Sequence, residues 1–73
     1  MVNRVHNKIR SIRIEKNLSQ EYIATSLNIS QSYYAKIENG KSSLTISDFF
    51  KILNVLEIDV VLFFNQINQN ENI

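Results

Sequence analysis

The chain has 73 residues and a formal net charge of +1, and it contains no cysteine, no proline and one glycine. The lack of cysteine excludes a disulfide scaffold and a cysteine-based metal site, and a lone histidine, His6, argues against a zinc centre, so we expect no metal and no cofactor. Nothing in it resembles a signal peptide or a membrane-spanning apolar run, and residues 1–73 are therefore expected to form one small cytoplasmic domain with no membrane partner.

The first two predicted elements are helices joined by a short turn. Residues 5–16 are expected to form the first helix. Its inward-facing apolar positions are Val5, Ile9 and Ile12. Ser19 is a good N-cap for a second helix over residues 20–27, because its hydroxyl can accept a hydrogen bond from a backbone N–H of the first turn. We expect His6, near the terminus, to be exposed.

The third predicted helix, of about residues 30–39, has a narrow apolar side. Ser30 is its N-cap, and Asn28 tolerates the left-handed backbone of a tight turn between helices. At about 100° per residue, the apolar arc consists of Tyr33, Tyr34 and Ile37. The opposite arc has short or hydrogen-bonding side chains, one cation and no acid: Gln31, Ser32, Ala35, Lys36 and Asn39. This surface suits the base edges and phosphates of a DNA groove.

A fourth helix is predicted to run from about Thr45 to Leu56. Gly40 closes the preceding helix, since it can take a positive φ. Thr45 and Asp48 form a start that resembles a capping box, with Asp in the place usually taken by Glu or Gln. The predicted core stripe of this helix consists of Ile46, Phe49, Phe50, Leu53 and Leu56.

The last predicted element covers residues 60–64, which are apolar throughout, with Asp59 as its cap. If it is a helix, the core-facing side chains are Val60, Phe63 and Phe64. The β-branched pair Val60 and Val61 also fits the start of an exchanged strand, so both interpretations remain open. Residues 65–73, rich in Asn and Gln, are expected to form a frayed tail.

The capped helix pair, the preceding Ile9-Arg10-Ser11-Ile12-Arg13 and the following Gly40-Lys41 resemble the helix-turn-helix of the Cro/C1-type repressor family, also called the XRE family. The resemblance covers residues 9–64. It implies an all-α fold, a compact five-helix lambda-repressor-like DNA-binding domain. In this family the second helix of the pair enters the major groove and the first lies across the DNA backbone.

Three positions depart from the family's pattern. Asn17 and Asn28 stand where the family commonly has Gly, and Leu44 stands where it commonly has Pro. Asn is the best substitute for Gly at positive φ, so the first two departures are mild. The third is expected to loosen the loop before the fourth helix.

The resemblance also implies the roles of individual residues. Gln31, Ser32 and Lys36 are expected to face the bases. Tyr33, at the edge of the polar arc, either stacks on a sugar or a thymine methyl group or covers the edge of the core. Further candidate phosphate contacts lie on the outer side of the first helix and in the loop after Gly40. The full set of predicted phosphate contacts is Gln20, Arg10, Asn39, Lys41 and Ser43. Arg13 and Glu38 are expected to form an internal salt bridge, the alternative being two solvated side chains.

Charge is divided unevenly along the chain. Residues 1–41 hold seven Lys and Arg against three acids, whereas residues 42–73 hold one Lys against four acids. This asymmetry is expected if one face meets a polyanion, although a solvated helix face would also account for it.

The C-terminal region is expected to hold a homodimer interface, because a small chain with an exposed apolar patch usually associates through it. The predicted interface consists of Ile52, Val55, Val61, Leu62 and Phe64. Pairing through a two-fold axis would set two recognition helices about 34 Å apart, which matches half-sites one DNA turn apart.

The sequence therefore favours a transcriptional regulator that binds double-stranded operator DNA as a homodimer, with no small-molecule ligand. Both phage Cro-like repressors and the controller proteins of restriction-modification systems have this short form. An antitoxin-like protein-interaction module on the same fold is the alternative, using the acidic half and the surface of residues 60–64. No nucleophile, base or metal set accompanies the acidic residues of the C-terminal half, so catalysis is not expected.

Overall fold

The computed structural model describes residues 2–71, and the side chains of residues 4–68. Within the described residues the chain forms five helices and no strand, as the sequence predicts. In chain order these are α1 (Val2–Glu15), α2 (Gln20–Leu27), α3 (Gln31–Glu38), α4 (Ile46–Leu56) and α5 (Val60–Glu71). None of the helices in this range is long and apolar enough to cross a membrane.

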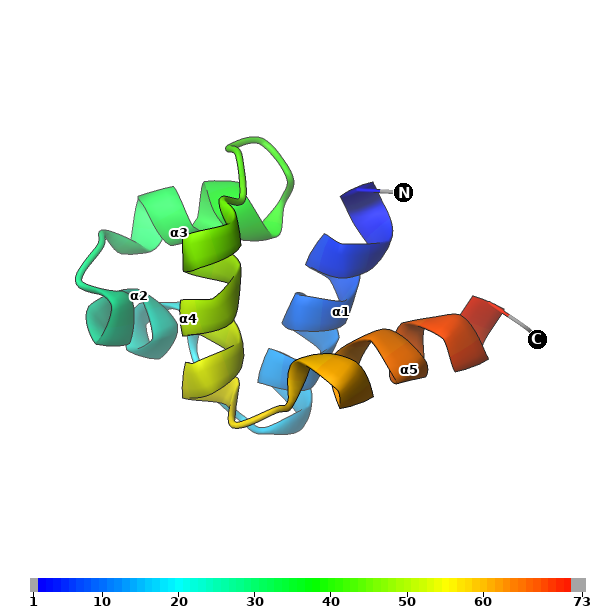
Figure 1. Ribbon diagram of the computed structural model, residues 1–73. Coiled ribbons are helices and arrows are strands. Elements are labelled where there is room, and N and C mark those ends of the chain that lie inside the picture. Colours follow the sequence, from blue (N-terminus) through cyan, green and yellow to red (C-terminus); the bar gives the residue numbers. More distant parts are fainter. Residues whose placement is uncertain (1, 72–73) are drawn as a thin grey trace.

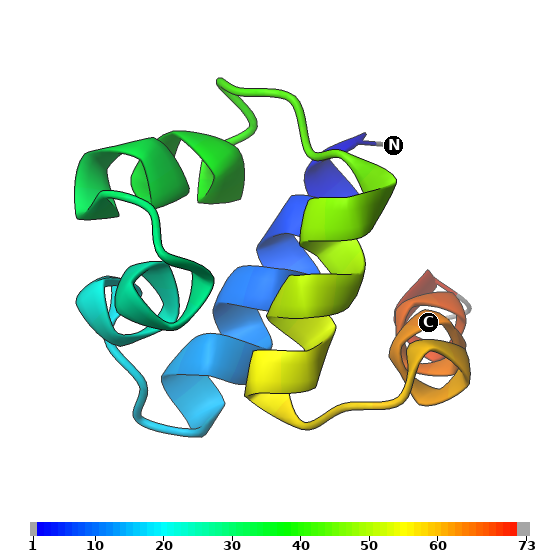
Figure 2. The same cartoon turned by 60° about the vertical axis from the view of Figure 1, so that its left-hand side comes forward.

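Helices α1 and α4 lie side by side in the centre of the molecule (Figure 1). The pair α2 and α3 packs against one side of them, and α5 lies on the other side, where it contacts α1 (Figure 2). The α2–α3 pair and α5 are therefore separated by the width of the central helices.

The helices begin where the sequence predicts, because the expected caps all form. Each capping side chain accepts hydrogen bonds from backbone N–H groups two or three residues further on, at 2.8–3.2 Å. These caps are Ser19, Ser30, Thr45 and Asp59. They satisfy backbone donors that a helix start otherwise leaves without partners. The exception is α1, which begins at Val2 rather than at residue 5.

The core brings together side chains from all five helices. Its buried apolar members are Ile9, Ile12, Ile23, Ala24, Tyr34, Ile37, Ile52, Leu53, Leu56, Phe63 and Ile67. The predicted stripe of α4 is partly wrong, since Ile46 and Phe50 are 77% and 51% exposed while Ile52 is fully buried. The face that reaches the core follows the spacing i, i+3, i+4, i+7 and starts at the half-buried Phe49, which leaves Ile46 and Phe50 on the outside.

Two further expectations about the chain ends are wrong. His6 is 5% exposed rather than solvated, because it lies three residues before Ile9 in α1 and so falls on the same buried face of the helix. Residues 65–71 continue α5 instead of fraying, since Ile67 lies four residues after Phe63 and packs with it in the core. Residues 72–73 of the predicted tail lie outside the described residues. Because residues 60–64 are helical, the strand interpretation does not describe this fold.

Among the residues that the structure describes, four take a left-handed backbone: Asn17, Asn28, Glu57 and Gly40, with φ between 56° and 76°. Both asparagines and the glycine were expected to tolerate it. The left-handed backbone of Glu57, which ends α4, was not expected. For a residue with a Cβ this conformation is less favourable by about 1–2 kcal/mol, because of steric contact with the backbone.

Replacing Glu57 by Gly is expected to raise the free energy of unfolding by about 0.5–1 kcal/mol, because relief of the left-handed strain exceeds the added entropy of the unfolded chain. Urea unfolding followed by circular dichroism measures this. Glu57→Ala is the matched control, since it removes the same carboxylate and keeps the Cβ; equal effects of the two substitutions would show that charge and not backbone strain is responsible.

Candidate nucleic-acid interface

A tight turn fixes α3 relative to α2. The backbone N–H of Asn28 bonds to the carbonyl groups of Ala24 and Thr25, and Ile29 N–H bonds to Ala24 O at 3.0 Å. Ala24 is 1% exposed, and its small side chain lets the two helices approach closely. Ser30 then starts α3 at once. The geometry is a helix, a left-handed Asn and a second helix, as the sequence predicts.

The two sides of α3 differ as expected from its periodicity. Tyr34 and Ile37 are buried, and the outward side chains are exposed: Gln31, Ser32, Lys36 and Asn39. Tyr33 lies between the two sides and is 40% exposed, which leaves part of its ring accessible to a neighbouring molecule. The exposed face of α3 thus combines hydrogen-bonding groups with one cation and contains no carboxylate.

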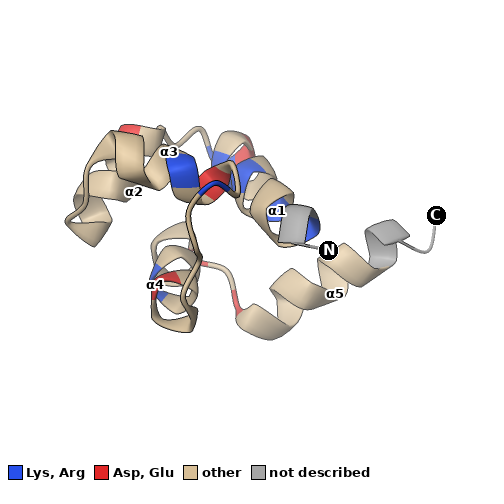
Figure 3. Ribbon diagram, turned by 90° about the horizontal axis from the view of Figure 1, so that it is seen from above, with Lys and Arg blue, Asp and Glu red and all other residues tan. Residues whose placement is uncertain are grey.

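The predicted phosphate contacts do not all lie together. Lys41 and Ser43 line a shallow hollow between the α3–α4 loop and α1, with Val5 and His6 on its other side. Arg10 is exposed on α1 beside a different hollow. In Figure 3 the Lys and Arg positions are concentrated on α1, α3 and the loop after α3, whereas α4 and the turn before α5 hold the three acids Asp48, Glu57 and Asp59 against the single cation Lys51. The charge asymmetry of the sequence is therefore also a spatial one.

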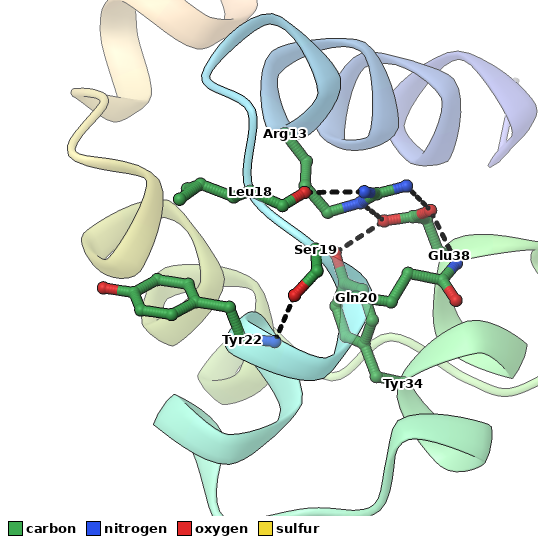
Figure 4. A network of polar contacts seen from close by, with 7 residues as sticks. All are labelled: Arg13, Leu18, Ser19, Gln20, Tyr22, Tyr34 and Glu38. Atoms are coloured by element: carbon green, nitrogen blue, oxygen red, sulfur yellow. Dashed lines mark hydrogen bonds and ion pairs between the residues drawn. The ribbon is translucent and has the colours of Figure 1, made fainter.

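Beneath this surface, Arg13 and Glu38 form the expected internal ion pair (Figure 4). Arg13 Nε donates to Glu38 Oε2 at 2.8 Å and Nη2 donates to Oε1 at 3.0 Å. The third guanidinium nitrogen, Nη1, donates to the carbonyl oxygen of Leu18 at 2.8 Å. Because the contact is bidentate and the Glu38 side chain is fully buried, it ties α1 to the end of α3 with defined geometry.

Two further donors complete the carboxylate's hydrogen bonding. Tyr34 Oη donates to Glu38 Oε2 at 2.7 Å, and Gln20 Nε2 donates to Oε1 at 3.0 Å. The role of the Tyr34 hydroxyl was missed by sequence reasoning, although its spacing of four residues from Glu38 on one helix is a usable signal. The contact of Gln20, which joins residues 18 apart, has no such local signal.

These contacts set the protonation of the network. Burial alone would raise the pKa of Glu38, but the hydrogen bonds from Arg13, Gln20 and Tyr34 outweigh it and hold the pKa below its ordinary value of 4.5. Burial and the hydrogen bond to Glu38 raise the pKa of the Tyr34 hydroxyl. At neutral pH the carboxylate is thus ionised and the phenol is a donor.

Comparison with known proteins matches the sequence of this chain to helix-turn-helix proteins. A family model described as helix-turn-helix matches residues 9–63. The control protein C.MunI of Mycoplasma sp. is 36% identical over 67 residues, which span 90% of each chain. Antitoxin HipB of Escherichia coli (strain K12) is 30% identical over 56 residues, covering 77% of this chain and 64% of HipB.

Solved structures agree with the sequence comparison. The restriction-modification controller protein C.Esp1396I superposes with a TM-score of 0.85 at 32% sequence identity, over 93% of this chain and 90% of that one. A single chain of the same controller protein, from the structure of its tetramer in complex with its natural 35 base-pair operator, superposes with a TM-score of 0.83.

Proposed function

The chain belongs to the XRE-type helix-turn-helix family of DNA-binding regulators, and on this premise we propose that it binds operator half-sites in a sequence-specific manner with α3 in the major groove. The observation that carries the proposal is the exposed, acid-free polar face of α3 behind a tight turn from α2. Proteins of this family are regulators, not enzymes. The related controller protein C.Esp1396I has been crystallised in complex with its operator DNA, which supports operator DNA as the partner proposed for this chain.

The proposed base-reading residues are Gln31, Ser32, Lys36 and Tyr33. Gln presents a donor and an acceptor that match adenine, and Lys donates to the guanine acceptors. Tyr33 is exposed enough for its ring to meet a sugar or a thymine methyl group. The proposed phosphate contacts are Gln20, Arg10, Asn39, Lys41 and Ser43, which would position α3 without reading sequence.

We place the homodimer interface on an apolar face that α4 and α5 share, which we call the α4–α5 face. Its exposed members are Ile46, Phe50, Val61, Leu62 and Phe64. The rings of Phe50 and Phe64 both pack beside Phe49, with centroid distances of 5.7 and 5.8 Å, so Phe50 of α4 and Phe64 of α5 form one apolar surface across the two helices. Ile52, which was expected in this interface, is fully buried in the monomer and is excluded from it, and Val55 is half-buried against the core.

Pairing through the α4–α5 face is compatible with DNA binding. Helix α5 lies on the far side of the central helices from α2 and α3 (Figure 2). A partner on that side would leave the polar face of α3 open, and a two-fold axis there would present two copies of α3 to successive turns of the groove.

The similarity to C.MunI, which extends over 90% of both chains, favours a regulator of the controller type. The similarity to HipB keeps the antitoxin-like module as a second candidate. The two candidates differ in their primary partner, which is operator DNA for the first and a second protein for the other.

Selection of duplexes from a random pool by the purified protein tests the proposal. The expected product is one enriched sequence with two inverted half-sites about one helical turn apart. Recovery of sequences with no common site from a folded protein would contradict specific DNA binding and would leave the protein-interaction module as the better candidate.

Replacing Gln31 or Lys36 by Ala is expected to weaken binding to the selected site by about 1–3 kcal/mol, because each loses a contact to a base edge. Binding to an unrelated duplex should change much less. Fluorescence anisotropy titrations on both duplexes measure the difference. Lys51→Ala on α4 is the matched control, since it removes the same charge away from α3. Equal proportional losses on the two duplexes would mean that these residues contact phosphate and not bases.

A further inference from the structure

The Gln20 side chain connects the start of α2, which the proposed function places against DNA, to the buried Arg13–Glu38 network. Its Nε2 donates to Glu38 Oε1 at 3.0 Å, while the same carboxylate is held by Arg13 from α1 and by Tyr34 from α3 itself. The carboxylate that accepts the Gln20 hydrogen bond is therefore also held in place by one side chain from α1 and one from α3. Gln20 is half-buried, whereas Glu38 is only 3% exposed.

The chemistry of this contact determines which way the amide faces. An ionised carboxylate has only acceptors, so Gln20 must present its nitrogen to Glu38 and not its oxygen. Figure 4 shows the amide oxygen of Gln20 directed away from the carboxylate. With one N–H committed to Glu38, the direction of the second N–H is also set, because the amide group is planar.

We propose that Glu38 is a positioning residue for DNA binding, and that it holds the Gln20 amide so that the second Nε2–H meets a DNA phosphate. The inference rests on the proposed function, in which Gln20 contacts phosphate. Glu38 itself never touches the DNA, since it is buried. Its contribution is to order the Gln20 side chain during folding, so that this ordering is not required again on binding.

Substitution of Glu38 by Gln changes the amide's partner in a defined way. The new side chain has one acceptor oxygen, and the donors of Arg13 and Tyr34 compete for it. Its NH₂ group then faces Gln20, which must turn its own oxygen inward or lose the contact. In either case the second Nε2–H of Gln20 no longer points in a fixed direction.

A double-mutant cycle on operator affinity tests the inference. The four proteins are the wild type, Gln20→Ala, Glu38→Gln and the double variant, each titrated with the selected duplex over a range of salt concentrations. Circular dichroism at low temperature checks that each is folded. If Glu38→Gln does not fold, Glu38→Asp takes its place, because it keeps the charge and withdraws the carboxylate from Gln20.

Gln20→Ala is expected to lower affinity by about 5- to 10-fold and to reduce the slope of log K against log salt by about 1, as loss of one phosphate contact does. On its own, Glu38→Gln should cause a similar loss of affinity and a similar reduction of the salt slope. In the Gln20→Ala background it should cause less than about a 2-fold further loss of affinity. Tyr34→Phe is the control. It removes one donor from the same carboxylate and keeps the Gln20 contact, so the salt slope should stay unchanged.

Equal losses from the Glu38 substitution in both backgrounds would overturn the inference, because Glu38 would then act through the fold alone. If Gln20→Ala leaves affinity and slope unchanged while Lys36→Ala weakens binding, the inference fails and the DNA-binding function stands. If no duplex is selected at all, the proposed function fails first.

Discussion

Removing either partner of the Arg13–Glu38 pair is expected to lower the free energy of unfolding by about 3–5 kcal/mol. The carboxylate of Glu38 is buried, and the guanidinium of Arg13 is nearly so, with 0% and 11% of their side-chain surfaces exposed. A single substitution therefore leaves the remaining charge buried and without its partner. An exposed pair would contribute only about 0–1 kcal/mol, so the size of the effect distinguishes the two situations.

Urea and thermal unfolding of Arg13→Met, Glu38→Gln and the double variant measure this. The double variant is expected to lose less than the sum of the two single losses, because it leaves no unpaired charge. Lys16→Met is the matched control, since Lys16 is an exposed cation just beyond the end of α1. Independent effects below about 1 kcal/mol would contradict a structural role for the pair.

The same pair predicts how stability depends on pH. The pKa of Glu38 in the folded protein lies below the ordinary value of 4.5, because the hydrogen bonds that it accepts outweigh its burial. A carboxyl of lowered pKa contributes stability that is fully present above its unfolded pKa and is lost as the pH falls through its folded pKa. The difference in melting temperature between the wild type and Glu38→Gln should therefore be constant near neutral pH and shrink below about pH 4.5.

Local signals in the sequence account for the parts of this fold that could be predicted. A capping hydroxyl such as Ser30 acts on an N–H three residues away, and a left-handed position such as Asn28 depends on that residue's own backbone preference. These are interactions within one turn of chain, so the sequence reveals them directly. The exposed face of α3 was predictable for a similar reason, because a single helix repeats its environment every 3.6 residues.

The sequence predictions were wrong where packing between distant segments decides which side chains are buried. The core stripe of α4 was predicted wrongly because both Phe49 and Phe50 are suitable core residues. The helices packed around α4 select Phe49, whose ring lies against Phe63 of α5. Burial of Ile67 depends likewise on α5 docking against α1. The site shows the same division, since the exposure of Gln31 follows from α3 alone, whereas the contact of Gln20 with Glu38 requires the packed arrangement of α2 and α3.

Replacing Leu62 by Glu is expected to give a folded monomer that binds the operator about 100-fold or more weakly. Leu62 is 49% exposed, so a carboxylate at this position remains solvated in the monomer. In a dimer built on the α4–α5 face, each such carboxylate would be buried in an apolar contact, which is strongly unfavourable. A monomer then binds one half-site at a time and loses the advantage of two linked contacts, which amounts to about 10²–10⁴ in affinity.

Sedimentation velocity and operator titration together test the dimer. The wild type should sediment as a dimer at micromolar concentration and bind the operator with a steep salt dependence, whereas Leu62→Glu should sediment as a monomer with about half the salt slope. Thr25→Glu is the matched control for assembly, because it adds the same charge at an exposed position on α2 and should leave the oligomeric state unchanged. A wild type that stays monomeric at tens of micromolar, with operator affinity that Leu62→Glu does not alter, would overturn the dimer. In that case the exposed rings of Phe50 and Phe64 require another partner, because a continuous apolar surface of this kind marks an interaction site in a small chain.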